Sequence, residues 1–128
     1  MFDKVVEFFK TFGQEIDAEP NFKLLEFRFN LIDEENQEIA DEFAALANAR
    51  TDHEKKRIKI LLTKELADGL YVNLGAAVAL GLPIVEAFNE VHRSNMSKLT
   101  IDGKVLKRDD GKVLKSDQYT EANIEQFF

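Results

Sequence analysis

The chain has 128 residues, a length that fits one domain built around a single hydrophobic core. Its net charge of −7 disfavours binding to duplex DNA or to anionic membranes, because both require clustered lysine and arginine. The absence of cysteine excludes disulfides and thiolate zinc sites, and it fits a reducing cytoplasm. The N-terminal segment lacks the features of a signal peptide, and no apolar run predicts a membrane span. We therefore expect a cytoplasmic protein that binds neither nucleic acid nor membranes.

Apolar periodicity and helix-boundary residues predict four helices in the first hundred residues. We expect these helices at about 4–16, 20–49, 51–80 and 83–99. Thr51 and Glu54 have the spacing of a capping box, Gly81 is a helix-ending residue, and Pro83 suits the start of the fourth helix. The third helix is apolar nearly all round from Leu66 to Leu80, so we expect it at the centre of the fold. The prediction is an all-α, four-helix-bundle-like core.

The C-terminal segment has a different character. The hexapeptide DGKVLK occurs twice, at 102–107 and 110–115, and each Asp-Gly pair favours a tight turn. This pattern predicts a short hairpin, produced either by local duplication or by convergence on the same turn chemistry. A terminal helix is expected at 121–128, where two final phenylalanines favour docking over a solvated tail. We expect one domain over 1–128, with a helical core at about 4–99 and the hairpin and helix at 100–128.

Acidic residues occupy positions where a helix of this kind should be apolar. When the second helix is placed on an ideal wheel, Glu35 falls inside the apolar arc and Glu38 at its edge, whereas Glu34 points away from the centre of the arc. On the third helix, Glu65 and Asp68 lie within the apolar stripe. Burying an ionised carboxylate in apolar surroundings costs on the order of several kcal/mol, unless a proton, a basic partner or a metal ion compensates its charge.

Divalent metal is the compensation that best fits these four acids. A shared proton serves one pair, and few basic residues occupy these faces, although Lys64 is adjacent. Each pair has i, i+3 spacing, which projects the side chains together, and two facing pairs make an oxygen-rich site suited to Mg²⁺ or Mn²⁺. The alternatives are solvated surface acids and a carboxylate di-iron bundle; the latter requires Glu-x-x-His, which neither His53 nor His92 provides.

These motifs resemble a known family. The sequence EENQE at 34–38, followed by ELAD at 65–68, is similar to the acidic motifs of the all-α NTP pyrophosphohydrolases. This MazG-like group includes phosphoribosyl-ATP pyrophosphohydrolase and the dimeric dUTPases. The stretch EVHRSNMSKL at 90–99 and the DGK hairpin that follows also resemble single-domain members, so the likeness covers about residues 20–120.

The resemblance implies an obligate homo-oligomer, a dimer or a tetramer, with the site near the subunit interface. It further implies that Mg²⁺, or Mn²⁺, is held by Glu35, Glu38, Glu65 and Asp68. Glu34 is the candidate residue for activating water, with Glu38 as the alternative. The candidate contacts to the nucleoside triphosphate are Asn73, Arg93, Asn95 and Lys98.

We therefore expect an enzyme that hydrolyses an NTP or dNTP to the monophosphate and pyrophosphate, in house-cleaning or control of the nucleotide pool. One alternative keeps this chemistry but uses phosphoribosyl-ATP as the substrate. A second alternative is a helical oligomerisation module without enzymatic activity, whose melting would respond to neither Mg²⁺ nor nucleotide.

Overall fold

A computed structural model describes all 128 residues of the chain, which form four α-helices and no extended strand. The elements are α1 (Phe2–Thr11), α2 (Phe22–Asn48), α3 (Asp52–Ala79), α4 (Ile84–Met96) and a terminal 3₁₀ turn, η1 (Glu125–Phe127). The all-α prediction is confirmed. The chain divides into two compact units, Met1–Leu82 and Pro83–Phe128. No single helix combines the length and hydropathy needed to cross a bilayer; α3 and α4 do so only as a bent pair, by length and composition alone.

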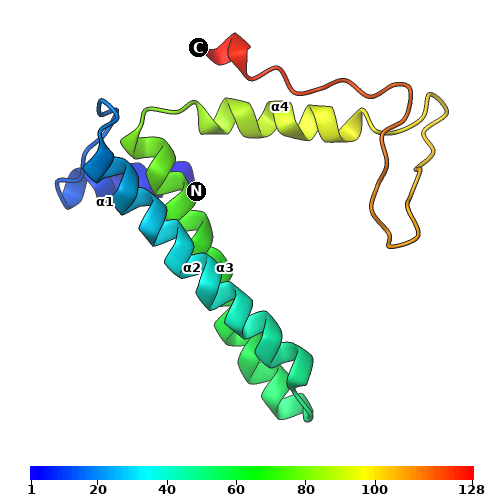
Figure 1. Cartoon of the computed structure of the whole chain (residues 1–128), viewed down its shortest axis with the longest axis horizontal. Helices are drawn as coiled ribbons and strands as arrows, with labels where there is room; N and C mark the ends of the chain where they lie inside the picture. Colours follow the sequence, from blue (N-terminus) through cyan, green and yellow to red (C-terminus); the bar gives the residue numbers. More distant parts are fainter. The chain divides into compact units, whose positions relative to one another are not determined.

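In the first unit, α2 and α3 pack side by side as an antiparallel hairpin (Figure 1). The predicted capping box at the start of α3 is confirmed. Thr51 Oγ1 accepts a hydrogen bond from the Glu54 N–H, and the Glu54 carboxylate accepts one from the Thr51 N–H, both at 3.1 Å. Gly69 permits close packing, because a Cβ there would lie 2.9 Å from the Ile39 Cδ1 methyl. Gly69 lies one turn beyond Glu65, so the helices approach closely beside the acidic residues.

Helix α1 packs against α3 at the open end of this hairpin (Figure 1). The core of the first unit forms here, where α1 contributes Val5 and Phe9, α2 contributes Leu24, and α3 contributes Val78 and Ala79. The connection from α1 to α2 is bonded to the end of α3. Its Asp17 N–H donates to the Val78 carbonyl at 3.1 Å, and its Ala18 N–H donates to the Ala79 carbonyl at 2.8 Å. These bonds satisfy carbonyl groups that the helix end leaves unpaired.

Several predicted boundaries differ from the observed ones. The first helix ends at Thr11 instead of residue 16, because Gly13 takes a positive φ of +64° that an α-helix does not accommodate. The second begins at Phe22, with Asn21 as its N-cap accepting a hydrogen bond from the Leu24 N–H at 3.0 Å, instead of at Pro20. The fourth helix, α4, ends at Met96 instead of residue 99.

The second unit contains α4 and the C-terminal segment that folds back onto it. The two predicted Asp-Gly turns are confirmed. Gly103 and Gly111 have positive φ, and each turn closes with the same pair of backbone hydrogen bonds. In the first turn the Thr100 N–H donates to the Lys104 carbonyl and the Gly103 N–H donates to the Thr100 carbonyl. In the second turn the Arg108 N–H donates to the Lys112 carbonyl and the Gly111 N–H donates to the Arg108 carbonyl. The repeated sequence therefore builds the same turn twice, and an antiparallel bridge joins residues 107 and 113. The predicted terminal helix at 121–128 is reduced to the three-residue turn η1.

Gly81→Ala is expected to destabilise the first unit. Gly81 has φ +64°, and a Cβ there would overlap the Asp17 carboxylate, so strain adds to the left-handed backbone cost of about 1–2 kcal/mol. Gly13→Ala is the matched control, because Gly13 has the same φ with nothing within 4 Å of its Cβ position. Urea unfolding at constant m-value should show a clearly larger loss for Gly81→Ala. Equal losses in the two variants would show that Asp17 imposes no additional constraint.

Candidate active site

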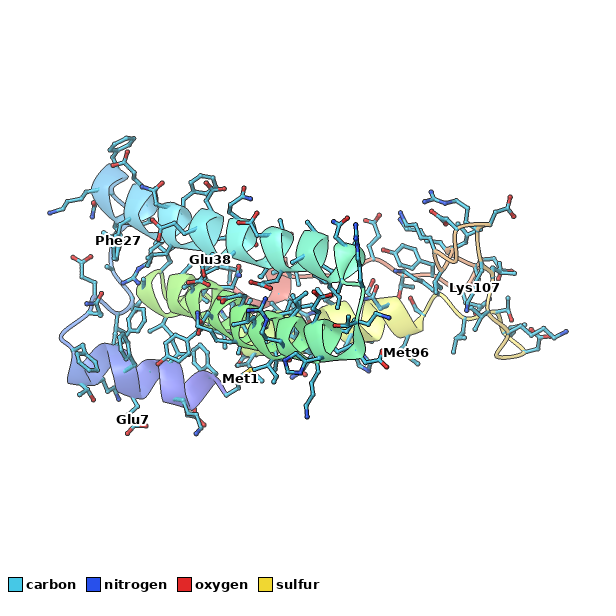
Figure 2. All side chains as sticks on the ribbon, turned by 90° about the horizontal axis from the view of Figure 1, so that it is seen from below. Met1, Glu7, Phe27, Glu38, Met96 and Lys107 are labelled. Atoms are coloured by element: carbon cyan, nitrogen blue, oxygen red, sulfur yellow. The ribbon has the colours of Figure 1, made fainter.

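Three carboxylates converge between the two helices of the hairpin. Glu35 and Glu38 extend from α2, and Glu65 extends from α3. One oxygen from each lies within 4.8 Å of the other two, a separation that one cation can bridge. Figure 2 shows Glu38 on the side of α2 that faces α3. The sequence predicted these three residues as ligands of one site, and the structure brings them together.

Glu35 is the least well compensated of these carboxylates. Its Oε2 atom is buried and has no hydrogen-bond partner. Burial raises the pKa of Glu35, and the negative charge of Asp68 raises it further. A buried oxygen without a donor is costly unless another group supplies positive charge. Glu35 is therefore suited to bind a cation.

Glu38 and Glu65 interact directly. A hydrogen bond with Glu65, together with the negative charge of that residue, raises the pKa of Glu38. This is the expected behaviour of two carboxyl groups that face each other, because one proton held between them relieves their repulsion. Glu65 itself is buried, with 7% of its surface exposed. Glu38 therefore holds a proton more readily than an ordinary glutamate does, and a divalent cation can replace that proton.

Lys64 is the cation that the chain itself supplies to the site. Its Nζ lies 2.9 Å from Glu65 Oε2 and 2.9 Å from Asp68 Oδ2. These two hydrogen bonds raise the pKa of Lys64. The predicted ligand Asp68 is thus paired with Lys64 and lies outside the group of three converging carboxylates. Because the Lys64 side chain is 61% exposed, it can move away and release both carboxylates to a metal ion.

Glu34 and Asn73 are the other predicted site residues of this unit, and neither belongs to the three converging carboxylates. Glu34 is exposed on α2, next to Glu35, as its position off the apolar arc predicted. Asn73 is also exposed, and its side-chain amide donates to the Gly69 carbonyl of its own helix at 2.7 Å. The proposed contact of Asn73 with substrate stays a prediction.

The remaining predicted substrate contacts, Arg93, Asn95 and Lys98, belong to the second unit. Arg93 binds Glu90 through two hydrogen bonds of 2.8 and 2.7 Å, and it also donates to Thr120 Oγ1 at 2.6 Å. The Arg93 guanidinium lowers the pKa of Glu90 to about 2. Lys98 donates to Asn95 Oδ1 at 2.8 Å. Arg93 thus holds the C-terminal segment on α4, and none of the three roles in substrate binding is tested by this geometry.

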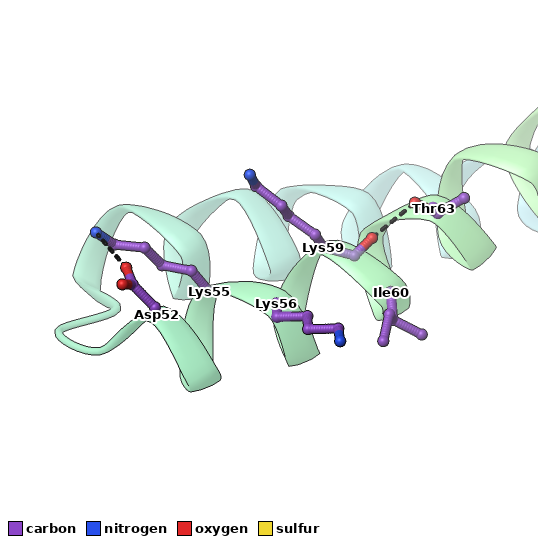
Figure 3. Close-up of a pocket in the computed structure, with 6 residues that line it drawn as sticks. All are labelled: Asp52, Lys55, Lys56, Lys59, Ile60 and Thr63. Atoms are coloured by element: carbon purple, nitrogen blue, oxygen red, sulfur yellow. Dashed lines mark hydrogen bonds and ion pairs between the residues drawn. The ribbon is translucent and has the colours of Figure 1, made fainter.

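A hollow of about 410 Å³ lies on the first half of α3, away from the acidic residues, and is shown in Figure 3. Lys55, Lys56 and Lys59 line it, but their ammonium groups point in different directions. The dashed contacts are local ones: Lys55 pairs with Asp52 at 4.0 Å, and Thr63 donates to the Lys59 carbonyl at 2.7 Å. The hollow lacks a buried, unpaired group, so it is a weaker candidate than the acidic site.

The acidic residues fit a hard divalent cation. They offer carboxylate oxygens only, which Mg²⁺ and Mn²⁺ prefer, and the unpaired Oε2 of Glu35 is an available donor atom. Zinc is less suited, because no histidine or cysteine is among the converging groups. The geometry thus describes a group of carboxylates that could hold a metal ion.

Comparison with protein families shows which family the chain belongs to. Residues 5–95 match the PRA-PH family, phosphoribosyl-ATP pyrophosphohydrolase. The chain belongs to this family. The match spans the acidic cluster and both helices that carry it, and it confirms the resemblance to the all-α NTP pyrophosphohydrolases. No curated protein matches the chain significantly. As a member of the PRA-PH family, the chain is a pyrophosphohydrolase-type enzyme that acts on phosphoanhydride bonds.

Glu35→Gln should stabilise the metal-free protein near neutral pH. Because folding raises the pKa of Glu35, the native state binds a proton more tightly than the unfolded chain does. The free energy of unfolding therefore falls as pH rises through the interval between the ordinary value of 4.5 and the raised pKa. Removing the charge prevents that loss, so the melting midpoint in EDTA should rise by roughly a few degrees.

Melting both proteins at a pH below the ordinary glutamate pKa provides an internal check. Glu35 is then protonated in the folded and the unfolded state, so the midpoints of Glu35→Gln and the wild type should converge. Glu26→Gln is the matched control, because Glu26 is an exposed glutamate of α2 outside the cluster. A Glu35→Gln protein that melts below the wild type near neutral pH would refute the stated cost of the Glu35 charge.

Proposed function

We propose that this protein is a Mg²⁺-dependent nucleoside triphosphate pyrophosphohydrolase, with Mn²⁺ able to replace Mg²⁺, that releases pyrophosphate and leaves a nucleoside monophosphate. The convergence of Glu35, Glu38 and Glu65 is the observation that carries the proposal. Membership of the PRA-PH family supports the reaction class. The role we assign is house-cleaning or control of the nucleotide pool. We also expect the enzyme to work in the cytoplasm, because a chain without cysteine needs no oxidising compartment.

The metal would be held by Glu35, Glu38 and Glu65, joined by Asp68 once Lys64 has moved. When bound, Mg²⁺ supplies charge neutralisation for the triphosphate and polarises the phosphorus under attack. The chain contributes the fixed positions of these carboxylates, because they extend from two packed helices instead of loops. Lys64, once freed from Asp68, is close enough to the site to pair with an oxygen of the departing pyrophosphate.

The nucleophile is a water molecule that attacks the α-phosphorus. A new O–P bond forms there, the bond from the α-phosphorus to the bridging oxygen breaks, and pyrophosphate leaves with that oxygen. Glu34 takes the proton from the water, because it is exposed beside Glu35. Glu38 is the alternative base: its raised pKa makes it a better proton acceptor near neutral pH, but it is also a proposed metal ligand.

A second candidate substrate is phosphoribosyl-ATP, which the name of the matched family specifies. The chemistry is the same, because water again attacks an α-phosphorus and pyrophosphate again leaves. The acidic cluster serves both substrates equally well. A panel of ribonucleoside and deoxynucleoside triphosphates together with phosphoribosyl-ATP, assayed by pyrophosphate release, distinguishes them. Absence of cleavage across the panel would favour the non-enzymatic oligomerisation module.

The proposed enzyme is a homodimer or homotetramer. On an ideal-helix projection of about 100° per residue, a set of exposed apolar side chains shares the flank of the hairpin opposite Glu38 and Asp68. This apolar flank consists of Leu25, Phe29 and Phe43 on α2 and Leu66 and Leu70 on α3. Phe29 alone is 65% exposed, and an exposed apolar surface of this extent is typical of a subunit interface.

Glu38→Gln and Asp68→Asn should each reduce Mg²⁺-dependent pyrophosphate release by roughly 100-fold or more, because each removes a metal ligand or its charge. Glu34→Gln should lower kcat while leaving Mg²⁺ affinity unchanged. Glu26→Gln is again the control and should retain full activity. Circular dichroism of each variant checks that helicity is intact. Undiminished turnover in both Glu38→Gln and Asp68→Asn would rule out the assigned site.

Leu66→Glu should shift the protein toward the monomer in size-exclusion chromatography with light scattering, because a charge would be buried in the interface. Ile60→Glu is the matched control: Ile60 is an exposed apolar residue of α3, 62% accessible, that lies outside the apolar flank. An oligomer that survives Leu66→Glu but dissociates in Ile60→Glu would place the interface on the other side of the hairpin.

A further inference from the structure

The first unit contains a second polar site, around Arg28, that the acidic cluster does not include. Arg28 lies on α2 and is only 8% exposed, yet it takes part in none of the ion pairs of the chain. Its Nε is buried and has no hydrogen-bond partner. Burial lowers the pKa of Arg28, and the negative charge of Glu15 offsets part of this effect. Buried polar groups in proteins nearly always have a hydrogen-bond partner, so the unpaired Nε of Arg28 indicates a functional role.

The Arg28 guanidinium forms part of the wall of a cavity of about 390 Å³, a volume within the range of small-molecule sites. The cavity lies where the α1–α2 connection meets the start of α2. Its other walls include Gln14, Glu15, Lys23 and Phe27. All of these residues belong to the first unit, so the cavity is complete within it.

The cavity combines one aromatic wall, Phe27, with hydrogen-bond donors. The guanidinium carbon of Arg28 lies 4.6 Å from the ring centre of Phe9 and 5.1 Å from that of Phe27. Phe27 is 49% exposed, so part of its ring remains free to stack on a planar ligand. Arg28 Nη2 donates to Gln14 Oε1 at 3.2 Å. The Oε1 atom of Gln14 accepts that bond, and the amide NH₂ group of Gln14 has two donors that a ligand can use.

The position of the cavity relates it to the acidic cluster. Arg28 and Glu35 are seven residues apart on one continuous helix, so they lie on the same face, about 11 Å apart along its axis. An extended nucleotide spans a comparable length between its α-phosphate and the far edge of its base. Figure 2 labels Phe27 and Glu38 at these two separate levels of α2.

We propose that the Arg28 cavity is the nucleobase site of the enzyme and that it selects bases with a carbonyl at C6 or C4, namely guanine, uracil and thymine, over adenine and cytosine, which carry an amino group at that position. This inference rests on the proposed function. Arg28 and Gln14 both present donors, which suit the carbonyl oxygen at C6 or C4 and oppose the amino group that adenine and cytosine carry there. A free anion fits less well, because the Glu15 carboxylate lines the same cavity. Phosphoribosyl-ATP, which carries adenine, would be a poor substrate for such a site.

The first experiment measures kcat/KM for GTP, UTP, ATP and CTP with Mg²⁺, by pyrophosphate release. The wild type should favour GTP and UTP by about tenfold or more, the discrimination expected of a good donor–acceptor pair. Gln14→Met and Arg28→Gln should remove this preference, mainly by raising KM for GTP and UTP. Gln37→Met, which alters an exposed glutamine of α2 bonded only to Asp41, is the matched control and should keep the preference.

The second experiment uses free nucleosides in EDTA and follows the backbone amide resonances of the wild type. Guanosine and uridine should perturb residues 13–15 and 21–28, whereas adenosine and cytidine should not. If triphosphates are cleaved without base preference and no nucleoside perturbs these residues, the nucleobase site is wrong and the proposed function stands. If no triphosphate is cleaved but uridine binds here, the proposed function fails and the cavity remains a base site. A folded Arg28→Gln variant that keeps the preference also overturns the assignment.

Discussion

The central constraint on the structure is the repulsion between carboxylates that the packing of α2 against α3 brings together, because the folded chain must compensate it. Glu35 and Glu65 lose hydration and, together with the exposed Glu38, face one another, which a folded chain tolerates only when positive charge or protons compensate. The ammonium of Lys64 beside Glu65 compensates part of this charge, and interaction with Glu65 raises the pKa of Glu38, so that Glu38 binds a proton more readily. Both the ammonium and the proton can be displaced. The unpaired Oε2 of Glu35 shows that neither is sufficient.

The rest of the first unit holds this arrangement in place. The capping box at Thr51 and Glu54 sets the start of α3, and Gly69 allows the helices to approach closely beside the acids. At the open end, α1 and the connection that follows it are bonded to the last turn of α3. That connection also forms one wall of the Arg28 cavity, so the same contacts that stabilise the hairpin shape the proposed base site.

The sequence predicted the features that helix periodicity controls. The four helices, the capping box and the inward positions of Glu35, Glu38 and Glu65 follow from residue spacing alone. Features set by tertiary contacts were not predictable in this way. The pairing of Asp68 with Lys64 depends on a side-chain conformation, and the short α1 depends on the backbone of Gly13.

Arg28 shows what sequence reasoning missed. It lies seven residues before Glu35, on the same face of α2, where the sequence suggested that few basic residues occur. Its position was a usable signal, because a cation inside an apolar arc needs a partner as much as a carboxylate does. The cavity beside it could not be predicted, since Gln14 comes from a connection whose course is set by its bonds to α3.

Calorimetric titration of the protein with Mn²⁺, in two buffers of different ionisation enthalpy, measures metal binding and proton release together. Slightly above the ordinary pKa of glutamate, the raised pKa values of Glu35 and Glu38 predict saturable binding accompanied by release of protons into the buffer. Heat that shows no saturation, or that is unchanged when Glu65 is replaced by glutamine, would contradict a metal site between α2 and α3.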